Sequence, residues 1–232
     1  MPYPAIALIS VVIFACVHLF ADRMRWCTTG FQARFLSAGG GIAIAYVFLD
    51  LLPKLSKSDY IVVHSGAFPY LERHVYIMAL LGFLLFFVDD RTADGSKSTR
   101  PYWFSLLSYV LFNFLVGYAI VDKNNPEVRP LALFTLAMGL HYFVNDYSLN
   151  KNYREEQQRY GKWLLVASLF LGWFVGVWFT LSAVSIALAS AFIGGGVIMN
   201  VIRHELPEDN PHSLGAFLFF ALIYSIILLS IG

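Results

Sequence analysis

Eight apolar stretches divide this chain, and each is long enough to cross a lipid bilayer. They cover approximately residues 4–21, 35–53, 74–90, 102–122, 130–148, 162–179, 182–203 and 213–231. A hydrocarbon core of roughly 30 Å needs about 20 consecutive apolar residues of helix. The sequence therefore predicts an all-α, polytopic membrane protein with eight transmembrane helices.

The composition favours the same class and excludes others. Hydrophobic residues make up 58% of the chain and charged residues only 13%, which is not the balance of a soluble domain. Because the loops are short, we expect residues 1–232 to form a single transmembrane domain whose partner is the lipid bilayer. The net charge of +1 predicts no nucleic-acid partner.

Lysine and arginine residues indicate how the chain lies in the membrane. Most of the 16 fall in the loops after the first, third, fifth and seventh stretches. The positive-inside rule places such loops in the cytoplasm, so both termini are expected to be extracytoplasmic. The first stretch lacks a basic leader and a small-residue cleavage site, which predicts a retained helix. The expected location is the plasma (inner) membrane, with multiple passes.

An internal repeat joins the second and seventh stretches. Gly39–Lys54 reads GGGIAIAYVFLDLLPK and Gly194–Glu208 reads GGGVIMNVIRHELPE, so each has a glycine triplet, an apolar run and an acidic residue shortly before proline. The two are five stretches apart in the order of the chain, so they run in opposite directions across the membrane. Inverted repeats of this kind are common in transporters. Glycine triplets also let helices pack closely, and the two readings are compatible.

Polar residues inside the apolar stretches are the candidate functional residues, because lipid makes such groups costly. Asp50 is expected at the outer mouth of a polar path, Asn113, His141 and Asn145 midway, and Asp146 near the inner end. The inner mouth carries His204, Glu205 and Glu208. Imidazole and carboxylate groups are ligands for zinc and related divalent metals. The alternatives are a neutral histidine bonded to a neighbouring helix and solvated charges at helix ends.

These stretches resemble the ZIP family of divalent-metal transporters. SAGGGIAIAYVFLDLLP in the second stretch is similar to a ZIP second helix, with Asp50 in place of the family's histidine. LLGFLLFFVDD resembles a third helix, and the glycine-rich run ending in HELPE resembles a seventh. The resemblance implies eight helices, both termini outside, inverted repeats and transport of a divalent metal.

The metal-binding motifs of the family are only partly kept. FNFLVGYA fits the frame of the fourth-helix motif, but Phe112 replaces its histidine and Val116 its bridging acid. HYFVND fits the fifth-helix frame and keeps His141, while Tyr142 and Val144 stand where the family has glutamate and proline.

The resulting prediction is a reduced midplane site with one imidazole, two amides and a peripheral carboxylate, Asp146. Its cargo would be Zn²⁺, Fe²⁺ or Mn²⁺, bound weakly because few anionic ligands offset the lost hydration of the ion. No organic cofactor is expected.

Three functions are compatible with this sequence. The first is a ZIP-like transporter of divalent cations, and the second is a non-transporting scaffold or metal sensor with the same fold. The third is a membrane-embedded metalloenzyme that uses His204, Glu205, Glu208 and His212. We expect a transporter rather than an enzyme. The phenylalanine-rich faces of the third, fourth and eighth stretches allow a homodimer.

Overall fold

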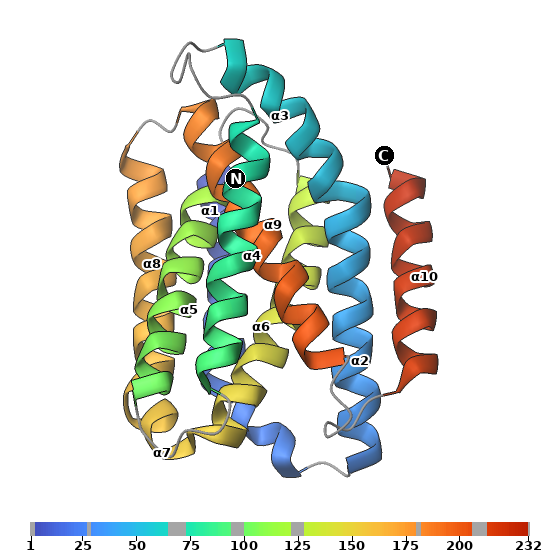
Figure 1. The fold of residues 1–232 in the computed structure, drawn as a ribbon. Coiled ribbons are helices and arrows are strands. Elements are labelled where there is room, and N and C mark those ends of the chain that lie inside the picture. The colour runs from blue at the N-terminus through green and yellow to red at the C-terminus, as the bar shows by residue number, and fades with distance from the viewer. Residues whose placement is uncertain are drawn as a thin grey trace.

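A computed structural model of the chain describes residues 3–26, 29–64, 73–93, 100–121, 128–179, 182–205 and 213–231. Within these ranges every predicted apolar stretch is helical, and the fold is all-α (Figure 1). The first half contains α1 (Tyr3–Phe20), the short 3₁₀ helix η1 (Ala21–Trp26), α2 (Thr29–Tyr46), the π-helical turn η2 (Val47–Leu51), α3 (Leu52–His64), α4 (His74–Ala93) and α5 (Arg100–Ala119). The second half contains α6 (Val128–Asn152), α7 (Arg154–Glu156), the π-helical turn η3 (Gln157–Gly161), α8 (Lys162–Trp178), α9 (Ala183–Glu205) and α10 (Leu214–Ile231).

The second predicted helix is longer than its apolar stretch. The backbone is helical from Thr29 to His64, because α2, η2 and α3 follow one another without a break. Pro53 lacks an N–H group and cannot bond the carbonyl of Leu49 one turn earlier, which normally kinks or ends a helix. The π-helical turn Val47–Leu51 lies at this point and accommodates the missing bond.

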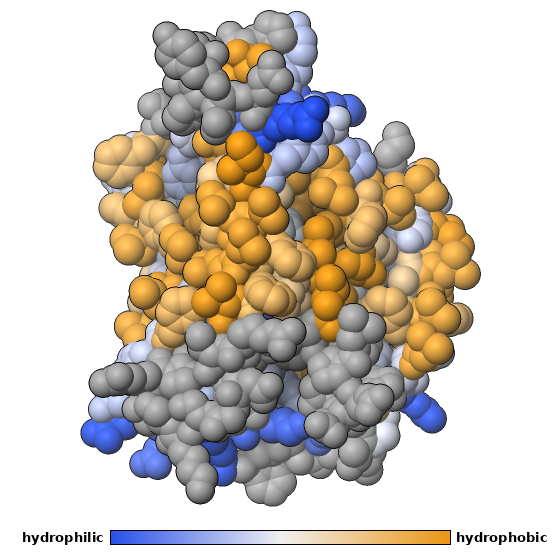
Figure 2. Space-filling view, viewed as in Figure 1, coloured by the Kyte–Doolittle hydropathy of each residue, from blue (hydrophilic) through white to orange (hydrophobic). Residues whose placement is uncertain are grey.

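Several helices are long and apolar enough to span a membrane. Among the described residues there are five, namely Tyr3–Arg23, Gly30–Lys57, Tyr102–Ala119, Arg154–Trp178 and Ala183–Ile202, and the shorter apolar helices are His74–Val88 and Leu214–Ser230. Apolar side chains cover the middle of the face seen in Figure 2, and polar side chains gather towards its upper and lower ends. The exposed side chains on α4 and α10 include Leu80 and Leu229, at 55% and 72% exposure. The chain is therefore a multi-pass helical membrane protein.

The helices pack in a pattern that repeats. The main contacts join α4 with α9, α2 with α10, α5 with α8 and α1 with α6, and further contacts join α2 with α6 and α5 with α9. These contacts form equivalent pairs when α1 is exchanged with α8, α2 with α9, α4 with α10 and α5 with α6. The contact of α4 with α9 then becomes that of α10 with α2, the contact of α5 with α8 becomes that of α6 with α1, and the contact of α2 with α6 becomes that of α9 with α5. α1 also contacts α8, and α2 contacts α9, so those pairs map onto themselves.

The two glycine triplets lie at equivalent helix contacts. A Cβ atom at Gly41 in α2 would overlap the carbonyl oxygen of Phe217 in α10. A Cβ atom at Gly195 in α9 would overlap the carbonyl oxygen of Ala79 in α4. Glycine is required at both positions because the backbones approach too closely for any side chain.

The two ends of the bundle are distinct. At the termini end, α1 begins and α10 ends, and α3 extends beyond the neighbouring helices (Figure 1). The opposite end carries η1 and α7, and we call it the α7 end. An ion pair of 3.6 Å between Arg154 and Asp22 connects the segments that follow α1 and α6 there.

Candidate functional site

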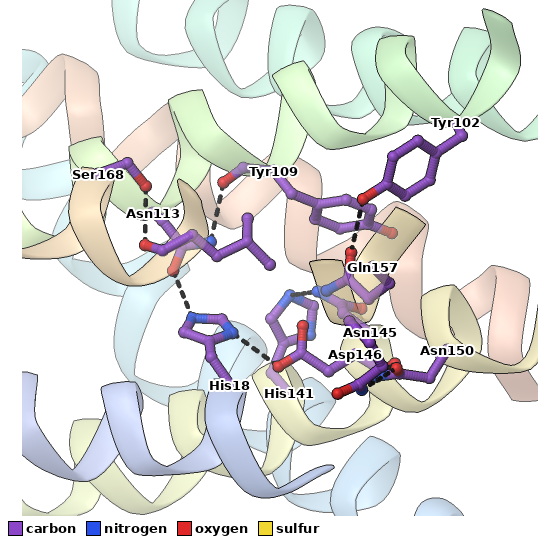
Figure 3. Close-up of polar contacts among 12 residues, drawn as sticks. His18, Tyr102, Tyr109, Asn113, His141, Asn145, Asp146, Asn150, Gln157 and Ser168 are labelled. Atoms are coloured by element: carbon purple, nitrogen blue, oxygen red, sulfur yellow. Dashed lines mark hydrogen bonds and ion pairs between the residues drawn. The ribbon is translucent and has the colours of Figure 1, made fainter. Parts of the chain in front are cut away.

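Three buried polar side chains from three helices form a continuous hydrogen-bonded chain. His18 of α1 lies between Asp146 of α6 and Asn113 of α5 (Figure 3). Its Nδ1 is 2.6 Å from Oδ2 of Asp146, and its Nε2 is 2.8 Å from Oδ1 of Asn113. The three residues are 3%, 1% and 1% exposed, respectively. A buried His–Asp–Asn chain thus lies inside the helical bundle.

The hydrogen bonds of Asn113 restrict where the protons lie. The Nδ2 group of Asn113 donates to the carbonyl of Tyr109 at 2.8 Å, which leaves Oδ1 facing His18. Because Oδ1 can only accept, Nε2 of His18 carries a proton. A second proton lies between Nδ1 and Asp146, on either group. The pair has no net charge in either arrangement, which limits the cost of burying it.

His141 and Asn145 form a second group of buried polar side chains. Together with His18, Asn113, Asp146 and Asn200 we call them the cluster. They are one turn apart on α6, and Nδ2 of Asn145 lies 3.1 Å from Nε2 of His141. Oδ1 of Asn145 is buried and finds no partner among the described residues. A cavity of about 10 Å³ beside His141 is also lined by Asn200 of α9 and by Gly39 and Gly40 of α2. It is about the size needed for one water molecule.

A line of amide side chains leads from Asp146 towards the α7 end. Nδ2 of Asn150 donates to the backbone carbonyl of Asp146 at 2.8 Å. Gln158 donates to Asn150 at 2.6 Å, and Lys162 donates to Gln158 at 2.9 Å. Hydrogen-bonding side chains therefore connect the backbone of α6 at Asp146 with the charged end of the bundle.

Aromatic and aliphatic side chains occupy three positions that the expected alignment with the ZIP motifs assigns to metal ligands. Phe112 is fully buried with its ring centroid 5.6 Å from that of His141. Tyr142 is 1% exposed, and its ring lies 4.7 Å from the imidazole of His18. Val116 is fully buried as well. These three positions are therefore occupied by packed, buried side chains.

The structure brings together four of the predicted site residues. Asn113 and Asp146 meet through His18, and His141 meets Asn145. Asp50 lies apart, at the termini end, where it pairs with Lys54 at 2.8 Å. The side chains of His204 and Glu205, and the whole of Glu208 and His212, lie outside the described residues, so the roles assigned to them stay predictions.

Asp146 differs from its prediction as a peripheral carboxylate. That interpretation is wrong, because the carboxylate is 1% exposed and bonded to His18. Its position near the end of an apolar stretch suggested the surface, but α6 continues to Asn152 and η1 lies against it. No group of three or more His, Cys, Asp or Glu side chains suited to a metal occurs within the part of the chain that the structure describes.

His18 and Asn200 are the members of the cluster that sequence analysis did not select. His18 was visible as a lone imidazole near the end of the first apolar stretch, but its partners are 128 and 95 residues away in the chain. Asn200 accepts a hydrogen bond from the hydroxyl of Tyr109 at 3.1 Å. Isolated polar residues inside apolar stretches were the available signal for both.

The hydroxyl group of Tyr142 provides a test of whether a ligand is bound in the cluster. It is buried and has no partner among the residues described. If no ligand occupies the site, Tyr142→Phe is expected to raise the free energy of unfolding by about 1 kcal/mol, because it removes an unsatisfied group. Tyr109→Phe is the control, because it breaks a hydrogen bond to Asn200 and should lower this free energy by about 1 kcal/mol. Unfolding in mixed micelles measures both. A loss of stability for Tyr142→Phe would contradict an empty site.

Comparisons of the sequence with models of protein families and with curated proteins find no match.

Proposed function

We propose that this protein is a divergent, ZIP-like carrier that moves a divalent cation, Zn²⁺, Fe²⁺ or Mn²⁺, across the membrane. In this proposal the termini end faces the extracytoplasmic side of the plasma membrane. The observation that carries the proposal is the buried chain of His18, Asp146 and Asn113 at membrane depth. Ionisable groups inside a bundle of this kind are costly and mark transport pathways.

The packing of the helices supports an inverted repeat. The exchange that maps the main contacts described above onto one another pairs each of those eight helices with one that runs in the opposite direction, for example α2 with α9 and α5 with α6. The glycine triplets of α2 and α9 then occupy equivalent positions. Transporters built in this way place the substrate near the midplane between the two halves, and α5 and α6 carry most of the cluster.

The donor set fits a divalent cation that binds weakly. Nδ1 of the His18 imidazole and the Asp146 carboxylate are both ligands for borderline divalent metals. Asn113 lies on the other side of the imidazole, where it accepts the proton of Nε2 and fixes the orientation of the ring. The cation would take the place of the proton between His18 and Asp146. With a single carboxylate, the site offsets only part of the lost hydration of the ion, so weak and reversible binding is expected.

A cavity at the termini end leads towards the cluster but does not reach it. The cavity measures about 160 Å³, and Tyr46, Lys54 and Phe134 are among its lining residues. From Phe134 in the wall of the cavity, a row of aromatic rings continues into the bundle. The ring centroid of Phe134 lies 6.2 Å from that of Phe14, and the ring centroid of Phe14 lies 5.2 Å from that of Tyr142. These aromatic rings separate the cavity from His18. Passage of an ion therefore requires them to move.

Uptake of cations into liposomes tests the proposal. The wild type is expected to give saturable entry of at least one of Zn²⁺, Mn²⁺ and Fe²⁺. His141→Ala is expected to remove it, because the substitution takes a buried imidazole, bonded to Asn145, out of the polar cluster. Met138→Leu is the matched control, since it changes a buried residue one turn away at nearly constant volume. Wild-type flux that His141→Ala leaves intact would place the route elsewhere.

A non-transporting scaffold is the second candidate, and the packing of Phe112, Val116 and Tyr142 favours it. Fully buried side chains at these positions leave little space for an ion. This candidate predicts no flux of any of the three cations from correctly folded wild-type protein. A homodimer stays a prediction under both candidates.

A further inference from the structure

An ion pair stands at the cavity of the termini end. Nζ of Lys54 donates to Oδ2 of Asp50 at 2.8 Å, four residues earlier on the same helical segment. The two side chains are 47% and 20% exposed, so the carboxylate is mostly covered and the ammonium is half in solvent. Lys54 also lines the cavity. Lys54 therefore links the carboxylate of Asp50, which is not itself a lining residue, to the cavity.

Lys54 is the cationic side chain that pairs with Asp50. The hydroxyl groups of Tyr46 and Tyr224 lie within electrostatic range of the carboxylate. The other residues that line the cavity are apolar apart from Tyr3 and Ser190. Lys54 thus contributes the only cationic side chain among those lining this cavity. The ammonium group of Lys54 would repel a cation that enters the bundle through this cavity, so a carrier of cations is not expected to keep it there without a role.

We propose that Asp50 is a separate loading site for a divalent cation and that Lys54 is a tethered competitor, which an arriving cation must displace. This inference rests on the proposed function. The ammonium group occupies the carboxylate while no ion is present, and it moves aside on its flexible side chain when a divalent cation binds. Asp50 lies in the π-helical turn η2, and turns of this type are common at functional sites.

The competition limits affinity by a predictable amount. A partly exposed ion pair shifts a binding equilibrium by up to about fivefold. Removing the ammonium should therefore tighten binding of a cation at Asp50 by up to about fivefold and lower KM for uptake by a similar factor. Ionic strength should reduce this difference, because added salt weakens the interaction between exposed charges.

Binding of Mn²⁺ to the full chain in lipid nanodiscs, followed by electron paramagnetic resonance, tests the site without relying on transport. Lys54→Met is expected to lower the Kd for Mn²⁺ by about two- to fivefold, and Lys54→Arg should keep the wild-type value. Lys57→Met is the matched control, because Lys57 is exposed on the same helix and loses the same charge. The gain from Lys54→Met should vanish when Asp50→Asn is combined with it.

Either of two gains in affinity would overturn the inference. One is an equal gain from Lys57→Met, which would reduce the effect to general surface charge. The other is a gain from Lys54→Met that survives in the Asp50→Asn background. The proposed function fails separately: if wild-type liposomes show no flux but Mn²⁺ binding depends on Asp50 and Lys54 as described, the loading site stands and transport does not. If flux requires His141 and Lys54→Met changes neither Kd nor KM, only the loading site fails.

Discussion

Asp146→Asn is expected to abolish cation uptake while leaving the protein folded. The asparagine amide has the shape of the carboxylate and can donate to Nδ1 of His18, which keeps the hydrogen bond now measured at 2.6 Å. The only carboxylate of the buried chain is lost, and with it the anionic ligand for the ion. Uptake into liposomes should fall to the level of protein-free vesicles, and the unfolding midpoint should change little. Uptake that persists would contradict a role for Asp146 in binding the ion.

A double substitution distinguishes what the pair of His18 and Asp146 contributes to stability from what it contributes to transport. His18→Leu alone should lower the free energy of unfolding by about 3–5 kcal/mol, because it leaves the Asp146 carboxylate buried without a partner. His18→Leu combined with Asp146→Leu should recover most of this loss, since no charge remains. Neither variant is expected to transport. Unfolding in mixed micelles and uptake assays check these expectations. If the single and double variants were equally stable, the two residues would not act as a pair.

The helices could be predicted from the sequence because membrane spans depend on the length of apolar runs. The eight apolar stretches all became helices. The contact between His141 and Asn145 also follows from sequence, because residues four apart share a helix face. The long extension of the second helix did not follow, because Pro53 signals an end unless a π-helical turn absorbs the missing hydrogen bond.

The centre of the candidate site depends on tertiary contacts that no local pattern contains. His18 and Asp146 are 128 residues apart, and only the packing of α1 against α6 brings them together. Asp146 was expected near the surface because it lies close to the end of an apolar stretch. Position along the stretch gives only the distance from the end of the helix, and it does not show that η1 packs against α6 and buries the side chain. The glycine triplets predicted close packing correctly, but their partner helices, α10 and α4, came only from the structure.

Gly195→Leu is expected to prevent folding, and Gly195→Ala to lower the free energy of unfolding by about 1–3 kcal/mol. Any Cβ at this position meets the backbone of α4 at Ala79, and a backbone cannot rotate away as a side chain can. Gly215→Ala is the matched control, because nothing lies within 4 Å of a Cβ there. That change should leave stability the same or raise it by up to about 1 kcal/mol, since alanine favours a helix over glycine. Unfolding in mixed micelles distinguishes the two. Equal effects at Gly195 and Gly215 would mean that α4 and α9 do not pack as closely as described, and the equivalence of the two halves would lose its main support.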